Sequence, residues 1–270
     1  MFMTHEKRGN SMGKGKVYIV GAGPGDPDLI TVKATKCIAQ ADVILYDRLV
    51  NRDLLLYAKK DAEFIYCGKA PGKHCVSQVE IHQLLISKSM EGKMVVRLKG
   101  GDPFIFGRGA EEAEELVKHG IQFEIVPGIT SGIAAPAYAG IPVTHREWGS
   151  SFAIVTGHCK NGKLDNIHWH HLAHGVDTIA IYMGINNLPY ICSQLQSCGM
   201  KPKTSIAVIE QGTTGFQRTV TGTIDTIVEV VKREGISNPA MIVIGEVVKL
   251  SGTLSWFSER TKDKEFVQKE

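Results

Sequence analysis

The hydrophobic positions in the first half of the chain fall into short β-branched runs, separated by stretches with helical spacing. These runs occupy residues 17–20, 42–46, 64–67, 94–98 and 123–126. Between the third and fourth runs, Ser77 and Glu80 form a capping-box pattern ahead of apolar residues at helical spacing. The alternation of strand and helix patterns predicts βαβ units and a mostly parallel sheet.

A second series of apolar runs begins after residue 150, and its spacing differs from that of the first. The runs occupy residues 152–156, 177–184, 204–212, 216–223 and 240–248. The third and fourth of these lie too close together for an intervening helix, so they are predicted to pair as an antiparallel hairpin. The sequence therefore predicts two α/β domains joined near residues 143–150, the second with a mixed sheet.

We expect an N-terminal α/β domain at 16–146 and a C-terminal α/β domain at 147–257. The flanking segments, 1–15 and 258–270, are polar and charged and are expected to form mobile tails. Between the two series of strands, residues 127–142 read PGITSGIAAPAYAGIP, almost without charge. Such a segment suits a tightly packed helix against a ligand or a neighbouring subunit, or else a buried connection.

Composition and charge narrow the class of protein. The chain has 270 residues, 43% of them hydrophobic, and a net charge of only +3, so its overall charge does not indicate a nucleic-acid partner. No stretch resembles a signal peptide or a run of 18 apolar residues, which favours a protein outside the membrane. The six cysteines contain no C-x-x-C pair and are interpreted as thiols of a reducing cytoplasm.

The first strand leads into the loop GAGPGDP, residues 21–27, which has features of a dinucleotide site. Asp47 lies after the second strand, where the dinucleotide fingerprint asks for an acid. However, the third glycine of that fingerprint is missing, Pro24 and Pro27 lack N–H groups, and Asp26 places a negative charge where a pyrophosphate would sit. The loop suits a neutral or cationic ligand such as S-adenosylmethionine, or a purely structural glycine turn.

The segment VVRLKGGDPFIFGRGAEEAEEL, residues 95–116, adds a second glycine loop that follows a strand. Its glycines allow close backbone approach to a ligand, and Asp102 offers a carboxylate that accepts hydrogen bonds or faces a cation. With this loop, the chain resembles the uroporphyrinogen-III-methylating branch of the tetrapyrrole methylase family. The matching motifs extend over about residues 16–256 and lie at 21–34, 41–50, 68–74, 95–112, 126–130, 139–146, 155–158, 182–184, 210–217 and 238–248.

The resemblance implies a two-domain tetrapyrrole-methylase fold that is active as a homodimer and holds its ligands in the cleft between domains. It implies two methyl transfers from S-adenosylmethionine to C2 and C7 of uroporphyrinogen III. These transfers give precorrin-2, by way of precorrin-1, for sirohaem or cobalamin synthesis, and leave S-adenosylhomocysteine. No metal is required, because the methyl group of a sulfonium is already electrophilic and needs only to be positioned.

The resemblance also assigns individual residues. The implied cofactor contacts are Pro24, Gly100, Gly101, Asp102, Ile105, Thr130, Ser131, Met183, Gly212 and Ala240. Asp47 matches the family's proposed proton acceptor, and its alternative role is to cap the loop after a strand. Lys69 matches the proposed proton donor, and its alternatives are a surface lysine or an anchor for a substrate carboxylate.

Uroporphyrinogen carries eight carboxylates, so several cations are expected around it. The candidates in or beside the motifs are Arg48, Lys69, Lys73, His74, Arg97, Lys99, Arg108 and Arg146. Only a subset is expected to contact the substrate, and the others are expected to form structural ion pairs.

Other interpretations make different predictions. His168, His170, His171 and His174 have the spacing of a metal site on one helical face, but an exposed polar helix is the favoured interpretation. Three other functions remain: an NAD-dependent oxidoreductase, a tetrapyrrole carrier that binds without turnover, and a sister methylase of a later corrin intermediate. The oxidoreductase requires a third glycine that the loop lacks, and measured methyl transfer separates the carrier from the methylases.

Overall fold

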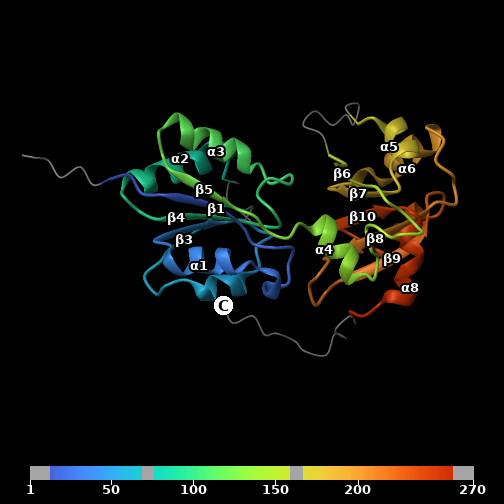
Figure 1. Cartoon of the computed structure of the whole chain (residues 1–270), viewed down its shortest axis with the longest axis horizontal. Coiled ribbons are helices and arrows are strands. Elements are labelled where there is room, and N and C mark those ends of the chain that lie inside the picture. Colours follow the sequence, from blue (N-terminus) through green and yellow to red (C-terminus); the bar gives the residue numbers. More distant parts are fainter. Residues whose placement is uncertain (1–12, 69–75, 159–166, 258–270) are drawn as a thin grey trace, which may run out of the picture. The chain divides into compact units, whose positions relative to one another are not determined.

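In the computed structural model, which describes residues 13–68, 76–158 and 167–257, the chain divides into two units (Figure 1). The first takes in the described residues up to Gly23 and from Pro27 to Gly128. The second takes in Pro24–Asp26 and the described residues from Ile129 onward. The chain therefore enters the second unit for three residues of the GAGPGDP loop, and again well before the predicted boundary at residues 146 and 147.

The first unit is built on a sheet whose strands all run parallel, as the βαβ pattern predicts. The sheet order is β3-β2-β4-β1-β5. The strands are β1 (Val17–Gly21), β2 (Val43–Tyr46), β3 (Glu63–Tyr66), β4 (Val95–Lys99) and β5 (Phe123–Val126). The helices are α1 (Val32–Gln40), α2 (Gln78–Met90) and α3 (Gly109–Lys118), with short 3-10 helices η1 (Pro27–Leu29) and η2 (Arg52–Tyr57).

Helices cover both faces of this sheet, with α1 on one face and α2 and α3 on the other (Figure 1). The strands are apolar at consecutive positions for this reason: Val20 packs toward α1, and its neighbour Ile19 packs toward α2 and α3. The predicted capping box starts α2, since the Ser77 hydroxyl accepts from the N–H of Glu80 and the Glu80 carboxylate accepts from the N–H of Ser77. Both predictions are confirmed.

Strands β1 and β4 lie side by side at the point where the chain changes direction across the sheet. The connection from β1 leads to β2, beyond β4, and the connection from β4 leads to β5, beyond β1. These connections pass over opposite faces of the sheet through α1 and α3 (Figure 1). In open parallel sheets, ligands bind outside the carboxyl ends of the strands at such a switch point. The two glycine loops, after β1 and after β4, both begin there.

The second unit has a mixed sheet in the order β6-β7-β10-β8-β9, and its strands β8 and β9 form the predicted antiparallel hairpin. The strands are β6 (Phe152–Thr156), β7 (Thr178–Tyr182), β8 (Ser205–Glu210), β9 (Arg218–Thr223) and β10 (Ala240–Ile244). The helices are α4 (Ser131–Tyr138), α5 (Trp169–Gly175), α6 (Leu188–Ser197), α7 (Ile227–Glu234) and α8 (Ser251–Leu254), with 3-10 helices η3 (Ile185–Asn187) and η4 (Glu246–Leu250).

The small apolar segment at 127–142 forms α4, which packs on the sheet of its own unit. Ala135 of α4 shares a buried cluster with Ala180 of β7 and Ala207 of β8. Small side chains on both sides allow the helix to approach closely, which is why residues after Ile129 belong to the second unit. Over the described part of the chain, no helix is long and apolar enough to cross a membrane.

Candidate active site

Three loops of the first unit, those after β1, β4 and β5, meet at the switch point of its sheet. Gly23 and Gly101 form an isolated antiparallel bridge, in which each N–H donates to the carbonyl of the other. A Cβ on Gly21 would lie 2.6 Å from the carbonyl oxygen of Gly101 and 2.6 Å from Gly128, which is closer than real Cβ contacts. The glycines are therefore needed because the three backbones touch.

Asp102 fixes the second of these loops through its carboxylate. The N–H of Phe104 donates to its Oδ1 at 2.8 Å, and the N–H of Gly128 donates to its Oδ2 at 3.0 Å. The predicted cofactor residues Gly100, Gly101 and Asp102 thus lie together, with Ile105 half-buried in the same loop. The side chain of Asp102 orders the backbone, and the N–H groups of the loop are held in fixed directions.

Strained backbone is concentrated in the motif segments. Five non-glycine residues among those described have positive φ, and they are Phe106, Arg108, Met183, Gln211 and Thr213. A non-glycine residue held in this left-handed region costs about 1–3 kcal/mol and persists where the surrounding structure imposes it, as at binding sites. All five lie within GGDPFIFGRG, YMG or EQGTT, so the strain coincides with the segments predicted to bind ligands.

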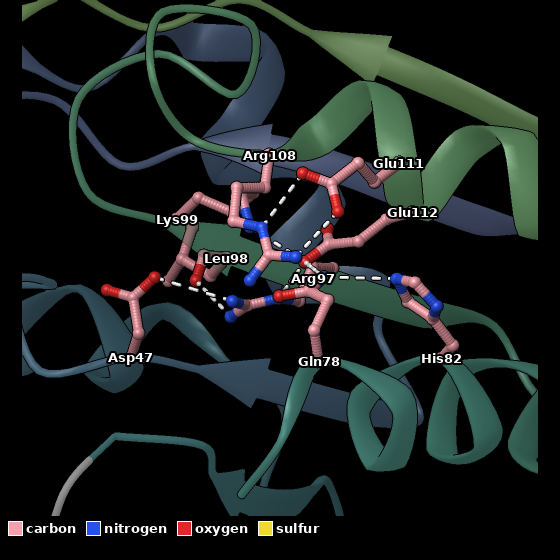
Figure 2. Close-up of polar contacts among 9 residues, drawn as sticks. All are labelled: Asp47, Gln78, His82, Arg97, Leu98, Lys99, Arg108, Glu111 and Glu112. Atoms are coloured by element: carbon pink, nitrogen blue, oxygen red, sulfur yellow. Dashed lines mark hydrogen bonds and ion pairs between the residues drawn. The ribbon is translucent and has the colours of Figure 1, made fainter. Parts of the chain in front are cut away.

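Arg97 and Lys99 alternate with apolar residues on β4 and point toward α2 and α3, where both are buried. Arg97 is 3% exposed and Lys99 is 4% exposed. Arg97 Nε donates to Glu112 Oε1 at 3.2 Å, and Lys99 Nζ donates to the same oxygen at 2.8 Å. Gln78 Nε2 also donates to Oε1, at 3.1 Å (Figure 2). We call Arg97, Lys99, Gln78 and Glu112 the Glu112 cluster.

The charges within the Glu112 cluster shift one another's pKa values. Burial by itself would raise the pKa of the Glu112 carboxyl, but the cations of Arg97 and Lys99 outweigh it, and the pKa is lowered. Burial lowers the pKa of Lys99, and the charge of Arg97 lowers it further, against the opposing effect of Glu112. Glu112 is therefore held as a buried carboxylate between two cations.

Asp47 follows the carboxyl end of β2 and lies against this cluster. Its Oδ2 is 3.5 Å from Arg97 Nη2, and the N–H of Leu49 donates to its Oδ1 at 3.3 Å. Figure 2 shows the guanidinium of Arg97 between the carboxylates of Asp47 and Glu112. The side chain of Asp47 remains 30% exposed, so a partly accessible carboxylate is tied to a buried network.

In the second unit, the hydroxyl of Tyr182 anchors the start of α4. The N–H of Gly132 donates to the Tyr182 hydroxyl at 2.5 Å, and that hydroxyl shares a hydrogen bond with Thr130 Oγ1, also at 2.5 Å. Thr130 is the N-cap residue but makes no cap bond of its own. Tyr182 thus positions Thr130 and Ser131, which are two predicted cofactor residues. Tyr182 itself directly precedes the strained Met183 in the chain.

The short GAGPGDP segment inside the second unit is held by α4 and by the loop after β8. The N–H of Asp26 donates to Thr213 Oγ1 at 3.1 Å, and the hydroxyl of Tyr138 donates to Asp26 Oδ2 at 2.7 Å. Gln217 Oε1 in turn accepts from the N–H of Thr213 at 2.8 Å. The negative charge that argued against a pyrophosphate therefore anchors the loop, with Pro24 at its start.

The remaining predicted cofactor residues lie at one edge of the second sheet. Strand β10 is antiparallel to both β7 and β8. Its first residue, Ala240, therefore lies beside the carboxyl ends of those two strands. Ala240 pairs with Glu210, and Gly212 follows two residues later. A Cβ on Gly212 would lie 2.5 Å from the Cβ of Ala135 in α4. Gly212 is thus held against the same helix that begins at Ser131.

The other predicted cations have different surroundings. Arg48 and Arg146 are exposed, and no ion pair involves either of them among the described residues. Arg108 is exposed and makes a two-pronged contact with Glu111, Nε to Oε1 at 2.9 Å and Nη2 to Oε2 at 2.6 Å. Arg97 and Lys99 are the structural ion pairs expected for part of the set. Lys69, Lys73 and His74 lie outside the described residues.

The histidine run lies on α5 and before it, with His168, His170, His171 and His174 all exposed. The rings of His170 and His174 are 4.6 Å apart between centroids. Within the described ranges, no three His, Cys, Asp or Glu side chains are grouped in a way that could hold a metal ion. The exposure agrees with the interpretation as a polar helix face.

Sequence reasoning missed Glu112, Gln78 and Tyr182. Arg97 and Lys99 provided a usable signal, since two cations two residues apart on a strand of a doubly covered sheet need a buried counter-charge. The sequence could not identify which acid supplies that charge. For Tyr182, no comparable signal was present.

Comparison with known proteins identifies the family. The profile of the family described as Tetrapyrrole (Corrin/Porphyrin) Methylases matches residues 16–228. The chain belongs to the tetrapyrrole methylase family. It is 66% identical over 237 residues to a uroporphyrinogen-III C-methyltransferase of Priestia megaterium, a match covering 88% of this chain and 100% of the relative.

Two solved structures of the family have the same fold. One is a uroporphyrin-III C-methyl transferase from Thermus thermophilus complexed with S-adenyl homocysteine, with a TM-score of 0.75, 38% identity, and coverage of 87% of this chain and 94% of the other. The second is a cobalt precorrin-4 methyltransferase, with a TM-score of 0.77, 32% identity, and coverage of 91% and 99%. Because methylases of two different substrates superpose equally well, the fold alone does not select the substrate.

The site residues fit the cofactor of this family, S-adenosylmethionine. The cofactor has no phosphate, and the first loop offers prolines without N–H groups and a carboxylate engaged by Tyr138. The second loop presents glycine backbone held by Asp102, and the segments around Met183 and Thr213 present strained backbone. Such neutral backbone groups suit an adenosine and an amino acid better than a pyrophosphate.

Proposed function

We propose that this protein transfers methyl groups from S-adenosylmethionine to C2 and C7 of uroporphyrinogen III, giving precorrin-2 by way of precorrin-1. The observation that carries the proposal is the 66% identity with a uroporphyrinogen-III C-methyltransferase over the whole length of that relative. The coincidence of strained backbone with the motif segments supports a ligand site in those segments.

The cofactor is bound through backbone groups of the loops and strand edges described above. We assign its contacts to Pro24, Gly100, Gly101, Asp102, Ile105, Thr130, Ser131, Met183, Gly212 and Ala240. When bound, it supplies a methyl carbon that is already electrophilic, so the protein need only place a nucleophilic pyrrole carbon in line with it. Asp102 and Tyr182 serve this positioning by fixing the loops that carry several of these residues.

Methylation at a pyrrole carbon requires a proton to be removed afterwards from the macrocycle. Asp47 is the proposed proton acceptor, and its support is a carboxylate that is partly exposed beyond the carboxyl end of β2 and ion-paired with Arg97. Lys69 is the proposed proton donor. Both assignments rest on the resemblance, and the geometry of Asp47 adds to it.

The substrate carboxylates need accessible cations. Arg48 and Arg146, which are exposed and without described ion-pair partners, are proposed to bind them directly. Arg108 is exposed but paired with Glu111, so it would exchange that partner for a substrate carboxylate. Lys73 and His74 complete the proposed set. Arg97 and Lys99 are buried in the Glu112 cluster, so they are not proposed to contact the substrate carboxylates directly.

The proposal includes a homodimer in the cytoplasm that serves sirohaem or cobalamin synthesis. Support for these points comes from the family resemblance. Analytical ultracentrifugation of the purified chain measures the oligomeric state, and a monomer at catalytic concentrations would contradict it.

The deciding experiment is incubation with uroporphyrinogen III and isotopically labelled S-adenosylmethionine, followed by mass spectrometry of the product. Two added methyl groups are expected, and none would exclude the proposed reaction. A sister methylase would leave uroporphyrinogen III unchanged and methylate a later corrin intermediate. A carrier would bind the tetrapyrrole without transfer, and an oxidoreductase would require a nicotinamide cofactor.

A further inference from the structure

The Glu112 cluster is built asymmetrically around its one buried carboxylate. Glu112 Oε1 accepts from Arg97, Lys99 and Gln78, whereas Oε2 is buried and has no hydrogen-bond partner among the described residues. Glu112 itself has an exposed fraction of 0%. A buried oxygen without a partner is unfavourable for folding, so the arrangement is not explained by stability alone.

The charges of the Glu112 cluster connect it to Asp47. Two buried cations and one buried carboxylate leave one positive charge in excess, and Arg97 directs its Nη2 to Asp47. The guanidinium binds both acids at once, through Nε to Glu112 and through Nη2 to Asp47 (Figure 2). A planar, forked group held at one end presents its other end in a fixed direction.

We propose that Glu112 is a positioning residue for the reaction: it holds Arg97, and through Arg97 it orients the carboxylate of Asp47. The inference rests on the proposed function, because it assigns Asp47 to proton transfer. Glu112 touches neither substrate nor cofactor in this role. It acts only through the guanidinium, whose orientation is further set by donation from Nη1 to the carbonyl of Leu98 at 3.2 Å.

Glu112→Gln tests the inference with little change of shape. The amide keeps an acceptor at Oε1 and places its nitrogen at Oε2, which has no described partner, but it lacks the negative charge that holds the guanidinium of Arg97 in place. We expect kcat to fall by about 10- to 100-fold, the effect of slight misplacement of a reacting group. The KM values and the affinity for S-adenosylhomocysteine should stay unchanged. A variant with wild-type kcat would overturn the inference.

A double-mutant cycle with Asp47→Asn separates positioning from a general structural effect. If Glu112 acts through Asp47, Glu112→Gln costs nothing further in the Asp47→Asn background. Losses that multiply in the double variant would overturn the inference. Normal turnover of Asp47→Asn alone would also overturn it, while leaving the methylation itself intact. An inactive wild-type protein would instead refute the proposed function.

Two further variants keep the test decisive. Should Glu112→Gln fail to fold, Arg97→Lys keeps the buried positive charge but lacks the fork that reaches both acids, so the same loss of kcat is expected, and wild-type kcat would overturn the inference. Glu124→Gln is the control, a carboxylate that also lies between two cations, Lys16 and Lys33, but stands outside the motif segments. It should lower the melting temperature and leave kcat unchanged, and an equal loss of kcat there would assign the effect to general destabilisation.

Discussion

Each unit of the protein buries one glutamate beside an arginine, and the two sites are satisfied to different degrees. In the second unit, Glu210 Oε1 accepts from the N–H and the hydroxyl of Ser237, at 2.9 and 2.7 Å, and its Oε2 accepts from Arg218 Nε at 2.6 Å. In the first unit, only one oxygen of Glu112 has partners among the residues that the structure describes. Both carboxyls have lowered pKa values, although burial alone would raise them.

The partners of the two glutamates differ in a second respect. Arg218 is 47% exposed and also donates to the carbonyls of Glu234 and Gly235, so it joins β9 to the end of α7. Arg97 is buried and joins Glu112 to a partly exposed carboxylate at a strand end. The comparison teaches that a buried ion pair which ties secondary structure together can satisfy every atom. At Glu112, which is proposed to serve a reacting group, one oxygen has no partner among the described residues.

The largest expected effect comes from removing the group that Glu112 is proposed to serve. Asp47→Asn and Lys69→Ala should each lower kcat by about 100-fold or more, because general acid or base catalysis contributes about 10²- to 10⁴-fold. Single-turnover methyl transfer measures the rate, and calorimetric titration with S-adenosylhomocysteine checks that cofactor binding persists. Near-normal turnover in both variants would remove the acid and base assignment and make Glu112 as structural as Glu210.

Truncation of the two glutamates should separate them in stability. Glu112→Ala leaves the buried Lys99 without its counter-charge and Arg97 with Asp47 alone, and it is expected to cost about 3–5 kcal/mol. Glu210→Ala frees Arg218 into solvent and is expected to cost about 1–3 kcal/mol, for the lost hydrogen bonds. Urea unfolding gives both free energies of unfolding. Equal losses of unfolding free energy would contradict the expectation that an exposed arginine partner makes the loss of its glutamate less costly.

A neutral polar anchor in the second unit gives a smaller effect. Tyr182→Phe removes the hydroxyl that accepts from Gly132 and contacts Thr130, at a cost of about 1 kcal/mol, or about a fivefold higher dissociation constant for S-adenosylhomocysteine. Tyr190→Phe, on an exposed ring of α6, is the control. Unchanged affinity in Tyr182→Phe would mean that Thr130 keeps its position without this anchor.

The smallest effect is expected from a surface carboxylate, Glu124, which serves as a reference for the two buried glutamates. Lys16 and Lys33 bind Glu124 and lower its pKa from 4.5 to about 2. A depressed carboxyl pKa stabilises the fold above the unfolded value and loses that contribution as the pH falls from about 4.5 toward 2. Glu124→Gln should therefore remove this part of the acid dependence of the urea midpoint. An identical pH profile in the variant would contradict it.

Much of the fold followed from local pattern. All ten apolar runs became strands, and the spacing between residues 204–212 and 216–223 correctly excluded a helix between β8 and β9. The capping box at Ser77 was readable because both of its residues lie within one turn. The boundary between the two units was harder to predict from the sequence, because α4 follows the first sheet in the chain but packs on the second sheet.

The candidate site divides in the same way. Asp47, Arg97 and Asp102 were identifiable as candidates from motifs, but the same motifs could not distinguish an exposed cation from a buried one. Arg97 and Arg48 each lie close to a strand end in sequence, yet only Arg97 points into the packed face between β4 and α3. That outcome depends on the register of the strands and on which helix covers them.

By itself, the sequence determined the order of strands and helices, the family, and the segments proposed to bind ligands, because these depend on local spacing and on motifs contiguous in the chain. Only the tertiary structure decided how single polar groups are partnered. Glu112 lies 15 residues from Arg97 and 34 from Gln78, and Asp47 lies 50 residues from Arg97. Hydrogen bonds and buried charges depend on distances of a few ångströms between such positions, and only folding brings them together.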